Sequence, residues 1–182
     1  MKLWLVRHAR PLVDEGVCYG ASDVAADAAH TQACAARLAE ALPQGLAVWY
    51  SPLQRCAQLA RALCELRPDL RTRADDRLAE MDFGCWEGVH WNAIDKVHYD
   101  TWTANFAQYR FGGHESVADL MRRVEEARAE AAGQGEELVW ITHAGVMRAM
   151  ALLAQGVTRL EHADQWPVDV PSFGRWCCQQ SV

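Results

Sequence analysis

Short apolar runs that alternate with longer helical stretches are the feature that most constrains this chain. The runs have four to six residues, too few for an amphipathic helix, and are typical of buried strands; they cover residues 3–6, 46–50 and 137–142. A further short strand is expected at 70–73. Apolar residues at helical spacing lie between and after them, at 27–42, 55–66, 116–131 and 146–154. Strands that alternate with helices predict a layered α/β domain. A run at 173–179 is expected to add an edge strand.

The first helical stretch carries its own start and stop signals. Asp27 is the expected N-cap of this helix, and Pro43 ends it. The stretch is rich in alanine, which favours a helix. The positions expected on its sheet-facing side are Cys34, Leu38, Ala41 and Leu42.

An aromatic-rich insert and a capped helix follow the third predicted strand. Six aromatic residues within 91–111 give a helical insert an aromatic face. Such a face more often packs against its own domain than binds a ligand, although it can cap a pocket. Ser116 followed by Asp119 resembles a capping box and starts the next helix, which Gly133 and Gly135 end.

Composition limits the classes of partner that the chain can bind. Its 182 residues are enough for one domain with a sizeable core, and 51% hydrophobic with 23% charged residues is typical of a soluble globular protein. A formal net charge of −6 argues against a general binder of nucleic acid or membrane surfaces. An anionic small molecule would therefore need a local positive patch.

The seven cysteines show the pattern of neither a zinc site nor a disulfide scaffold. They are scattered, none forms Cys-x-x-Cys, and Cys177 and Cys178 are adjacent. We therefore expect reduced thiols in a cytoplasmic protein, with no metal and no cofactor. Only four apolar residues separate Lys2 from Arg7, so neither a signal-peptide core nor a membrane-spanning helix is expected at the start.

Charged and imidazole side chains follow two of the predicted strands directly. Arg7 and His8 follow the first run, and His143 follows the run at 137–142. Ligand chemistry in open α/β sheets collects beyond the C-terminal ends of strands, so the histidines would converge if their strands are neighbours. Arg55 lies where the second strand passes into a helix N-terminus, which favours an anion. Arginines hold anions and a neutral imidazole can attack an electrophile, so these residues predict phosphoryl chemistry.

The segment 78–88 supplies candidate proton donors. It contains three carboxylates, two glycines and several apolar or aromatic anchors. A carboxyl group held against Phe83 or Trp86 would lose hydration, which disfavours its charged form and lets it donate a proton near neutral pH. These residues alone leave open which of the carboxylates does so, and the same string is also typical of a glycine-rich turn with solvated acids.

Five blocks in this order resemble the histidine phosphatase superfamily, also called the phosphoglycerate mutase-like family. The blocks span nearly the whole chain and are Leu5-Val6-Arg7-His8, Ser51-Pro52-Leu53-Gln54-Arg55, Leu78-Ala79-Glu80 through Trp86-Glu87-Gly88, Gly113-His114-Glu115-Ser116 and Thr142-His143-Ala144-Gly145. The resemblance implies an α/β fold, a three-layer αβα sandwich with a mostly parallel central sheet. It also implies one domain over residues 1–182, with a helical cap or insert around 90–114.

The same resemblance implies roles for individual residues. His8 is the implied nucleophile that forms a phosphohistidine. Arg7, Arg55 and His143 are implied to hold the phosphoryl oxygens. Glu80 is the implied acid, which protonates the leaving oxygen and then activates water. The expected activity is that of a metal-independent phosphomonoesterase.

Residues near these candidate catalytic groups match the family pattern less completely. Glu115 is the alternative proton donor, and Tyr19 and Ala144 complete the candidate substrate- and phosphate-binding residues. The chain departs from the family pattern after the nucleophile, with Ala9 where Gly is usual and Pro11 where Thr is usual. The methyl group of Ala9 fits beside a phosphate only if its φ stays negative. The missing Thr removes one potential hydrogen bond.

Three further blocks resemble the α-ribazole-5′-phosphate phosphatases of cobalamin synthesis. They are Cys18-Tyr19-Gly20 with Ser22-Asp23-Val24, Trp86-Glu87-Gly88, and His143-Ala144-Gly145-Val146-Met147-Arg148. We therefore expect a small phosphorylated metabolite as partner, and neither nucleic acid nor membrane; the sequence leaves a homodimer open. The alternatives are a broad-specificity phosphatase, a phosphoprotein phosphatase and a non-catalytic phosphate-binding module.

Overall fold

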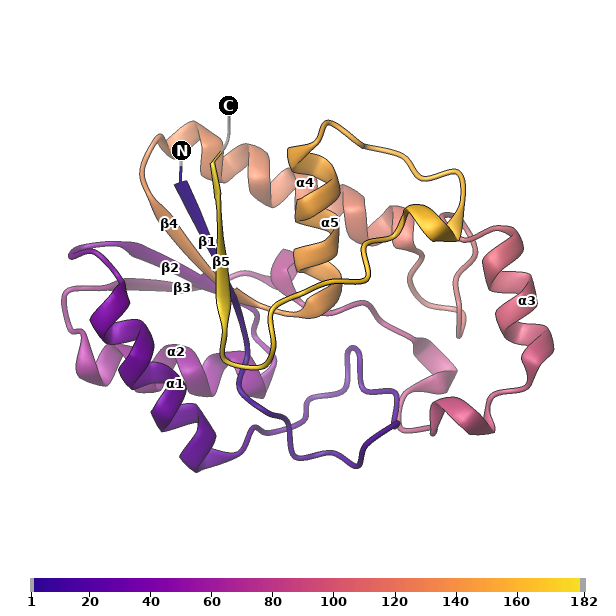
Figure 1. Ribbon diagram of the computed structural model, residues 1–182, viewed down its shortest axis with the longest axis horizontal. Helices are drawn as coiled ribbons and strands as arrows, with labels where there is room; N and C mark the ends of the chain where they lie inside the picture. The colour runs from indigo at the N-terminus through magenta and orange to yellow at the C-terminus, as the bar shows by residue number, and fades with distance from the viewer. Residues whose placement is uncertain (1, 181–182) are drawn as a thin grey trace.

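A five-stranded sheet lies between two layers of helices in the computed structural model, which describes residues 2–180 (Figure 1). The strands are β1 (Lys2–Arg7), β2 (Ala47–Tyr50), β3 (Arg71–Ala74), β4 (Leu138–Thr142) and β5 (Trp176–Gln180). Their order across the sheet is β3-β2-β4-β1-β5. β5 runs antiparallel to β1, and the other neighbouring pairs are parallel. The predicted α/β sandwich with a mostly parallel sheet is confirmed.

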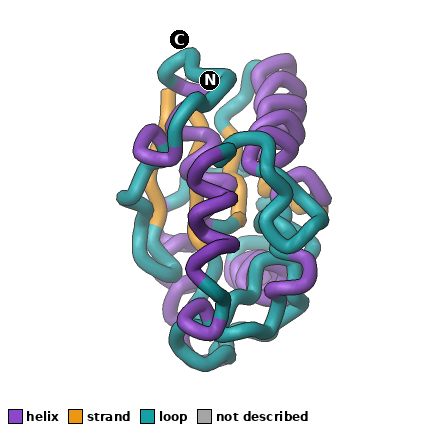
Figure 2. The backbone as a smooth tube through the Cα atoms, turned by 90° about the vertical axis from the view of Figure 1, so that its right-hand side faces the viewer, coloured by secondary structure: helices purple, strands orange, loops and turns teal. Residues whose placement is uncertain are grey.

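Helices cover both faces of this sheet. The α-helices are α1 (Ala28–Ala41), α2 (Gln54–Leu66), α3 (Lys96–Ala104), α4 (Val117–Gln134) and α5 (Ala144–Ala154). The 3₁₀-helices are η1 (Asp76–Leu78), η2 (Gly84–Trp86), η3 (Trp91–Ala93) and η4 (Ala163–Gln165). α1 and α2 pack on one face, and α4 and α5 pack on the other (Figure 1). Figure 2 views the molecule from the side of α3, which lies away from the sheet. Across residues 2–180, no helix has the length and apolar character needed to cross a membrane.

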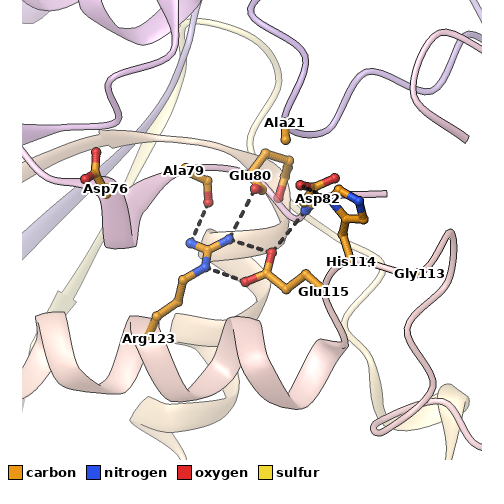
Figure 3. A pocket seen from close by; sticks show the side chains of 9 residues that line it. All are labelled: Ala21, Asp76, Ala79, Glu80, Asp82, Gly113, His114, Glu115 and Arg123. Atoms are coloured by element: carbon orange, nitrogen blue, oxygen red, sulfur yellow. Dashed lines mark hydrogen bonds and ion pairs between the residues drawn. The ribbon is translucent and has the colours of Figure 1, made fainter. Parts of the chain in front are cut away.

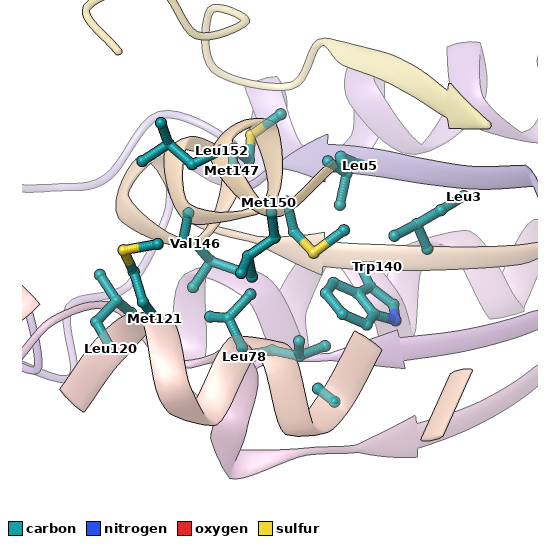
Figure 4. Packing of buried hydrophobic residues seen from close by; sticks show 14 of the residues in the cluster. Leu3, Leu5, Leu78, Leu120, Met121, Trp140, Val146, Met147, Met150 and Leu152 are labelled. Carbon is teal, nitrogen blue, oxygen red and sulfur yellow. The ribbon is translucent and has the colours of Figure 1, made fainter. Parts of the chain in front are cut away.

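The apolar run of β1 is buried on both faces because its side chains alternate between two cores. Leu3 and Leu5 belong to the core under α4 and α5, which Figure 4 shows. Trp4 and Val6 belong to the core under α1 and α2. Successive side chains of a strand point to opposite faces, so a strand covered on both sides needs a continuous apolar run.

Pairing of β1 with β4 brings the two histidine-bearing strand ends together. In the register of this parallel pair, Arg7 lies beside Thr142. The backbone N–H of His8 continues the ladder by donating to the Thr142 carbonyl oxygen at 3.0 Å. His8 and His143 therefore leave the sheet side by side, at the edge where ligands of open α/β sheets bind.

Several element boundaries differ from the sequence prediction. β5 begins at Trp176 and not at residue 173, because Gly174 takes a φ of 69° within a turn that precedes the strand. α5 begins at Ala144 and not at residue 146, with His143 as its N-cap. α4 runs through Gly133 and ends only at Gly135, whose φ of 67° is left-handed.

The aromatic insert is less helical than predicted. Only Lys96–Ala104 forms an α-helix within 91–111, and the remainder is a 3₁₀ turn and loops. The aromatic side chains do pack on one another, since the rings of Trp102 and Phe111 stack with centroids 4.4 Å apart. In α1, Asp27 is the N-cap as predicted, but Ala41 is exposed and does not face the sheet.

Candidate active site

His8 is buried and its ring orientation is fixed by the backbone. Its side chain is 2% exposed, and Nδ1 lies 2.7 Å from the carbonyl oxygen of Ala9. Because a carbonyl only accepts, Nδ1 carries the proton and Nε2 keeps a free lone pair. Burial, and next the positive charge of Arg55, lower the pKa of His8 to about 3. A neutral imidazole with its Nε2 unprotonated can act as a nucleophile.

The backbone at Ala9 has the negative φ that its methyl group requires. Ala9 is fully buried, and no residue other than glycine has a positive φ within residues 2–180. The extra methyl group is therefore accommodated without left-handed strain. Pro11 instead forms an isolated antiparallel bridge with Ala26.

His143 faces His8 from the end of β4. The two ring centroids are 5.0 Å apart. His143 is fully buried; its Nε2 lies 2.8 Å from Ser51 Oγ, and its Nδ1 accepts the Arg55 Nε–H at 3.2 Å. Nε2 is therefore the protonated nitrogen, and it donates to Ser51. Burial lowers the pKa of His143 well below its ordinary value, so this imidazole is neutral as well.

Arg55 is a fully buried cation at the start of α2. Its guanidinium donates to the carbonyl oxygens of Gly20 at 2.6 Å and Ser22 at 2.7 Å, in addition to His143. Among the residues that the structure describes, no carboxylate forms an ion pair with it. A buried charge that is held by dipoles alone favours an incoming anion.

Arg7 places a second guanidinium beside His8. Its Nη1 donates to the Pro171 carbonyl at 3.1 Å, and its guanidinium carbon lies 4.1 Å from the centre of the Phe173 ring. Its Nε is buried and has no hydrogen-bond partner among the described residues. Burial lowers the pKa of Arg7, and the neighbouring Tyr19 and Glu80 oppose this shift. Arg7, like Arg55, is therefore a cation that pairs with no carboxylate within residues 2–180.

Glu80 lies at the N-terminus of α5, next to these groups. Its Oε2 accepts the Gly145 N–H at 3.0 Å, and its Oε1 accepts the Met81 N–H at 3.0 Å. A Cβ atom at residue 145 would collide with this carboxylate, which explains the glycine. The carboxylate thus contacts the chain two residues after His143, at a helix N-terminus where negative charge is favoured.

The other two carboxylates of the segment 78–88 have structural partners. Glu87 accepts the backbone N–H groups of Ala21, Ser22 and Phe83, and so joins the loop around Tyr19 to this segment. Asp82 accepts the Gly84 N–H at 2.7 Å and pairs with His114 at 3.0 Å. The residue pattern alone did not distinguish these three carboxylates. In the structure only Glu80 of the three contacts the N-terminus of α5, next to His143.

Glu115, the alternative proton donor, is occupied by an ion pair. Both of its oxygens accept from Arg123, at 2.7 and 3.1 Å, and one also accepts the Asp82 N–H at 3.0 Å. It lines an open, polar cavity of about 610 Å³ together with Glu80 (Figure 3). The oxygens of Glu115 are thus turned toward Arg123, whereas those of Glu80 accept hydrogen bonds from the backbone amides of Met81 and Gly145.

Tyr19 and Ala144 adjoin the same group of residues. The Tyr19 ring lies 5.3 Å from the Arg55 guanidinium carbon. Burial raises the pKa of the Tyr19 hydroxyl, and the charge of Arg7 opposes the rise. Ala144 is the first residue of α5, so its N–H has no intrahelical acceptor and is free to bind an anion.

Comparison with known proteins identifies the family of this chain. The family description "Histidine phosphatase superfamily (branch 1)" matches residues 3–176. The chain belongs to the histidine phosphatase superfamily. It is a phosphoric monoester hydrolase.

The chain is similar to a curated protein and to two proteins of known structure. The "Putative phosphoserine phosphatase 2" of Hydrogenobacter thermophilus is 27% identical over 163 residues, which are 86% of this chain and 79% of the relative. A protein of known structure from Thermus thermophilus is 31% identical, with 98% of this chain and 92% of that one covered and a TM-score of 0.70. A mycobacterial glucosyl-3-phosphoglycerate phosphatase shares the fold, with a TM-score of 0.81 at 22% identity over 97% of this chain and 90% of that one.

Some groups around the site were not found from the sequence. Phe173 packs against the rings and charges of the site, with its centroid 5.3 Å from that of His8, but lay in a segment predicted only as an edge strand. Ser51, which accepts a hydrogen bond from His143, had no predicted role beyond its place in the family block that ends at Arg55. Both contacts join residues far apart in the chain, and no local pattern marks such contacts.

The buried, neutral state of His8 predicts a loss of stability in acid. The unfolded chain binds a proton at this residue below its ordinary pKa of 6.5, whereas the folded protein does not until about pH 3. Unfolding therefore takes up a proton in this window, and the free energy of unfolding falls as the pH decreases. Between pH 7 and 5 this group alone contributes about 2 kcal/mol.

Urea unfolding of the parent and of His8→Gln at pH 7 and pH 5 measures this contribution. The variant should lose less stability over that interval than the parent does. An equal loss in both would mean that His8 has the same pKa in the folded protein as in the unfolded chain.

Proposed function

We propose that the chain hydrolyses phosphomonoesters without a metal, through a phosphohistidine formed at His8. The observation that carries this proposal is a neutral imidazole with a free Nε2, set beside the guanidinium groups of Arg7 and Arg55, which have no carboxylate partners among the described residues. A phosphoryl group needs both an attacking atom and fixed positive charge. These residues supply both.

In the first step, His8 Nε2 attacks phosphorus in line with the leaving oxygen. The new P–N bond forms as the bond from phosphorus to the leaving oxygen breaks, and Glu80 gives its proton to that oxygen. The attack leaves positive charge on the ring of His8. The Ala9 carbonyl stabilises that charge through the hydrogen bond from Nδ1–H. Arg7, Arg55 and the N–H of Ala144 at the start of α5 bind the phosphoryl oxygens.

In the second step, water attacks the phosphohistidine. The Glu80 carboxylate takes a proton from this water as its oxygen bonds to phosphorus. The P–N bond breaks, which restores the neutral imidazole and releases inorganic phosphate. One carboxyl group thus serves as acid and then as base.

A phosphorylated enzyme is the first prediction of this mechanism. Rapid quenching with a ³²P-labelled phosphomonoester in the presence of EDTA should trap an acid-labile, alkali-stable phosphoenzyme. His8→Ala should abolish both the label and turnover, because no other buried neutral imidazole faces the site with a free Nε2 in the part that the structure describes. Activity retained in His8→Ala would exclude the phosphohistidine.

Dependence on the leaving group tests the proposed acid. An alkyl leaving group needs a proton as its bond breaks, whereas p-nitrophenolate does not. Glu80→Gln should therefore slow an alkyl phosphate by roughly 100- to 10,000-fold and slow phosphoenzyme formation from p-nitrophenyl phosphate far less. Single-turnover kinetics isolate this step from hydrolysis. Equal slowing of both substrates would remove Glu80 from this role.

We further propose α-ribazole 5′-phosphate, an intermediate of cobalamin biosynthesis, as the natural substrate. An aromatic cavity of about 450 Å³ supports this choice, since Glu80 and Gly145 stand at its edge and the leaving group must lie beside Glu80. Its aromatic lining consists of Phe83, Trp91, Trp102, Phe106 and Trp166. A flat, apolar benzimidazole attached to ribose suits such walls in size and polarity, whereas the zwitterionic serine of phosphoserine gains little from them.

A substrate panel tests this assignment. The value of kcat/KM should be highest for α-ribazole 5′-phosphate among phosphoserine, 3-phosphoglycerate, p-nitrophenyl phosphate and a phosphohistidine peptide. Trp166→Ala should lower kcat/KM for the ribazole ester by about tenfold and leave phosphoserine little changed, because only the former stacks on the ring. Trp176→Ala, which removes a half-buried tryptophan from β5, is the matched control. Similar values across the panel would instead indicate a broad-specificity phosphatase.

A further inference from the structure

Arg123 of α4 is the most completely satisfied guanidinium near the site, yet its hydrogen bonds reach none of the phosphate-binding side chains in the described part of the chain. Its Nη1 donates to the carbonyl oxygens of Arg77 and Ala79, each at 2.7 Å. Its Nη2 donates to the Glu80 carbonyl at 3.2 Å, and Nε and Nη2 also donate to the two oxygens of Glu115. An arginine has five N–H donors, and all five have acceptors here; Figure 3 shows those on Ala79, Glu80 and Glu115.

These acceptors lie along the segment that presents Glu80. Arg123 holds three carbonyl oxygens of residues 77–80, and the fourth, that of Leu78, accepts from Thr142 Oγ1 at 2.8 Å. Every carbonyl from Arg77 to Glu80 is thus tied to α4 or to the end of β4. The backbone before the carboxyl group of Glu80 has little freedom to shift.

Glu115 fixes the same segment on the other side of Glu80. Its carboxylate accepts the Asp82 N–H at 3.0 Å, and its own N–H donates to the Asp82 carbonyl at 3.3 Å. The ion pair with Arg123 is bidentate, and both side chains are mostly buried, at 19% and 17% exposure. Figure 3 shows the two side chains bridging α4 and the segment from Ala79 to Asp82.

We propose that Arg123, braced by Glu115, is a positioning residue for Glu80. By holding the backbone on both sides of Glu80, the pair fixes the carboxyl group against the N-terminus of α5 and at the leaving oxygen. A displacement of a catalytic group by about 1 Å can cost as much as 100-fold in rate. This inference rests on the proposed function, because it takes Glu80 as the proton donor.

The test is the leaving-group dependence of Arg123→Lys. A lysine keeps the charge but has three donors on one nitrogen, so it cannot reach all five acceptors. Arg123→Lys should slow phosphoenzyme formation from an alkyl phosphate by roughly 10- to 100-fold and from p-nitrophenyl phosphate by less than about threefold. In the double variant with Glu80→Gln, the alkyl ester should be slowed no further than in Glu80→Gln alone, because both changes remove the same acid.

The matched control is Arg128→Lys, on the same helix. Arg128 also makes a bidentate pair with a glutamate, Glu125, but that partner is on α4 and the pair does not hold the segment 77–82. It should leave both substrates unchanged. Urea unfolding of all variants separates a loss of stability from a loss of positioning.

Each outcome decides between the two proposals. If Glu80→Gln discriminates between the esters and Arg123→Lys slows both equally, Arg123 only supports the fold and the positioning role is wrong. If Glu80→Gln itself does not discriminate, the acid assigned in the proposed function is wrong and this inference falls with it. Should Arg123→Lys fail to fold, Glu115→Gln takes its place, with preferential slowing of the alkyl ester in support and equal slowing against.

Discussion

The buried charge of Arg55 is the constraint on which the rest of the site depends. Its guanidinium is held by the carbonyl dipoles of Tyr19, Gly20 and Ser22 and by the imidazole of His143, and by no carboxylate among residues 2–180. Removing such an ion from water is costly, so the fold must supply these acceptors at fixed places. They come from the loop that carries Gly20 and Ser22, which Glu87 in turn holds. In the proposed function, a phosphoryl dianion supplies the negative charge that Arg55 lacks.

Burial, together with the positive charge of Arg55, explains why both histidines are neutral. Burial removes the hydration that an imidazolium needs, and Arg55 adds repulsion, so protonation is disfavoured at His8 and His143. The Ala9 carbonyl and Ser51 Oγ then select one tautomer for each ring. The two neutral rings therefore differ: His8 keeps a free lone pair on Nε2, whereas both ring nitrogens of His143 are occupied, by Ser51 and Arg55.

Residues at strand ends could be predicted because local pattern and topology agree there. The apolar run before Arg7 and the run before His143 each identify a doubly covered strand, and parallel pairing then brings their ends together. The residue pattern alone could not choose among the three carboxylates, because each is defined by partners remote in sequence; Glu80 was implied only by the family resemblance. Glu80 meets Gly145, whereas Glu87 meets Ala21. The five acceptors of Arg123 likewise exist only once α4 packs beside residues 77–82.

The position of Glu80 suits both of the roles proposed for it. The N–H groups of Met81 and Gly145 hold its two carboxyl oxygens, so the side chain keeps one orientation at the N-terminus of α5. In the proposed mechanism the attacking water takes the place on phosphorus that the leaving oxygen has vacated, opposite His8. One carboxyl group in a fixed orientation can therefore contact the leaving oxygen in the first step and the water in the second. The backbone that orients this carboxyl group also begins the helix whose first amide faces the phosphoryl group, so the two groups are placed by the same helix end.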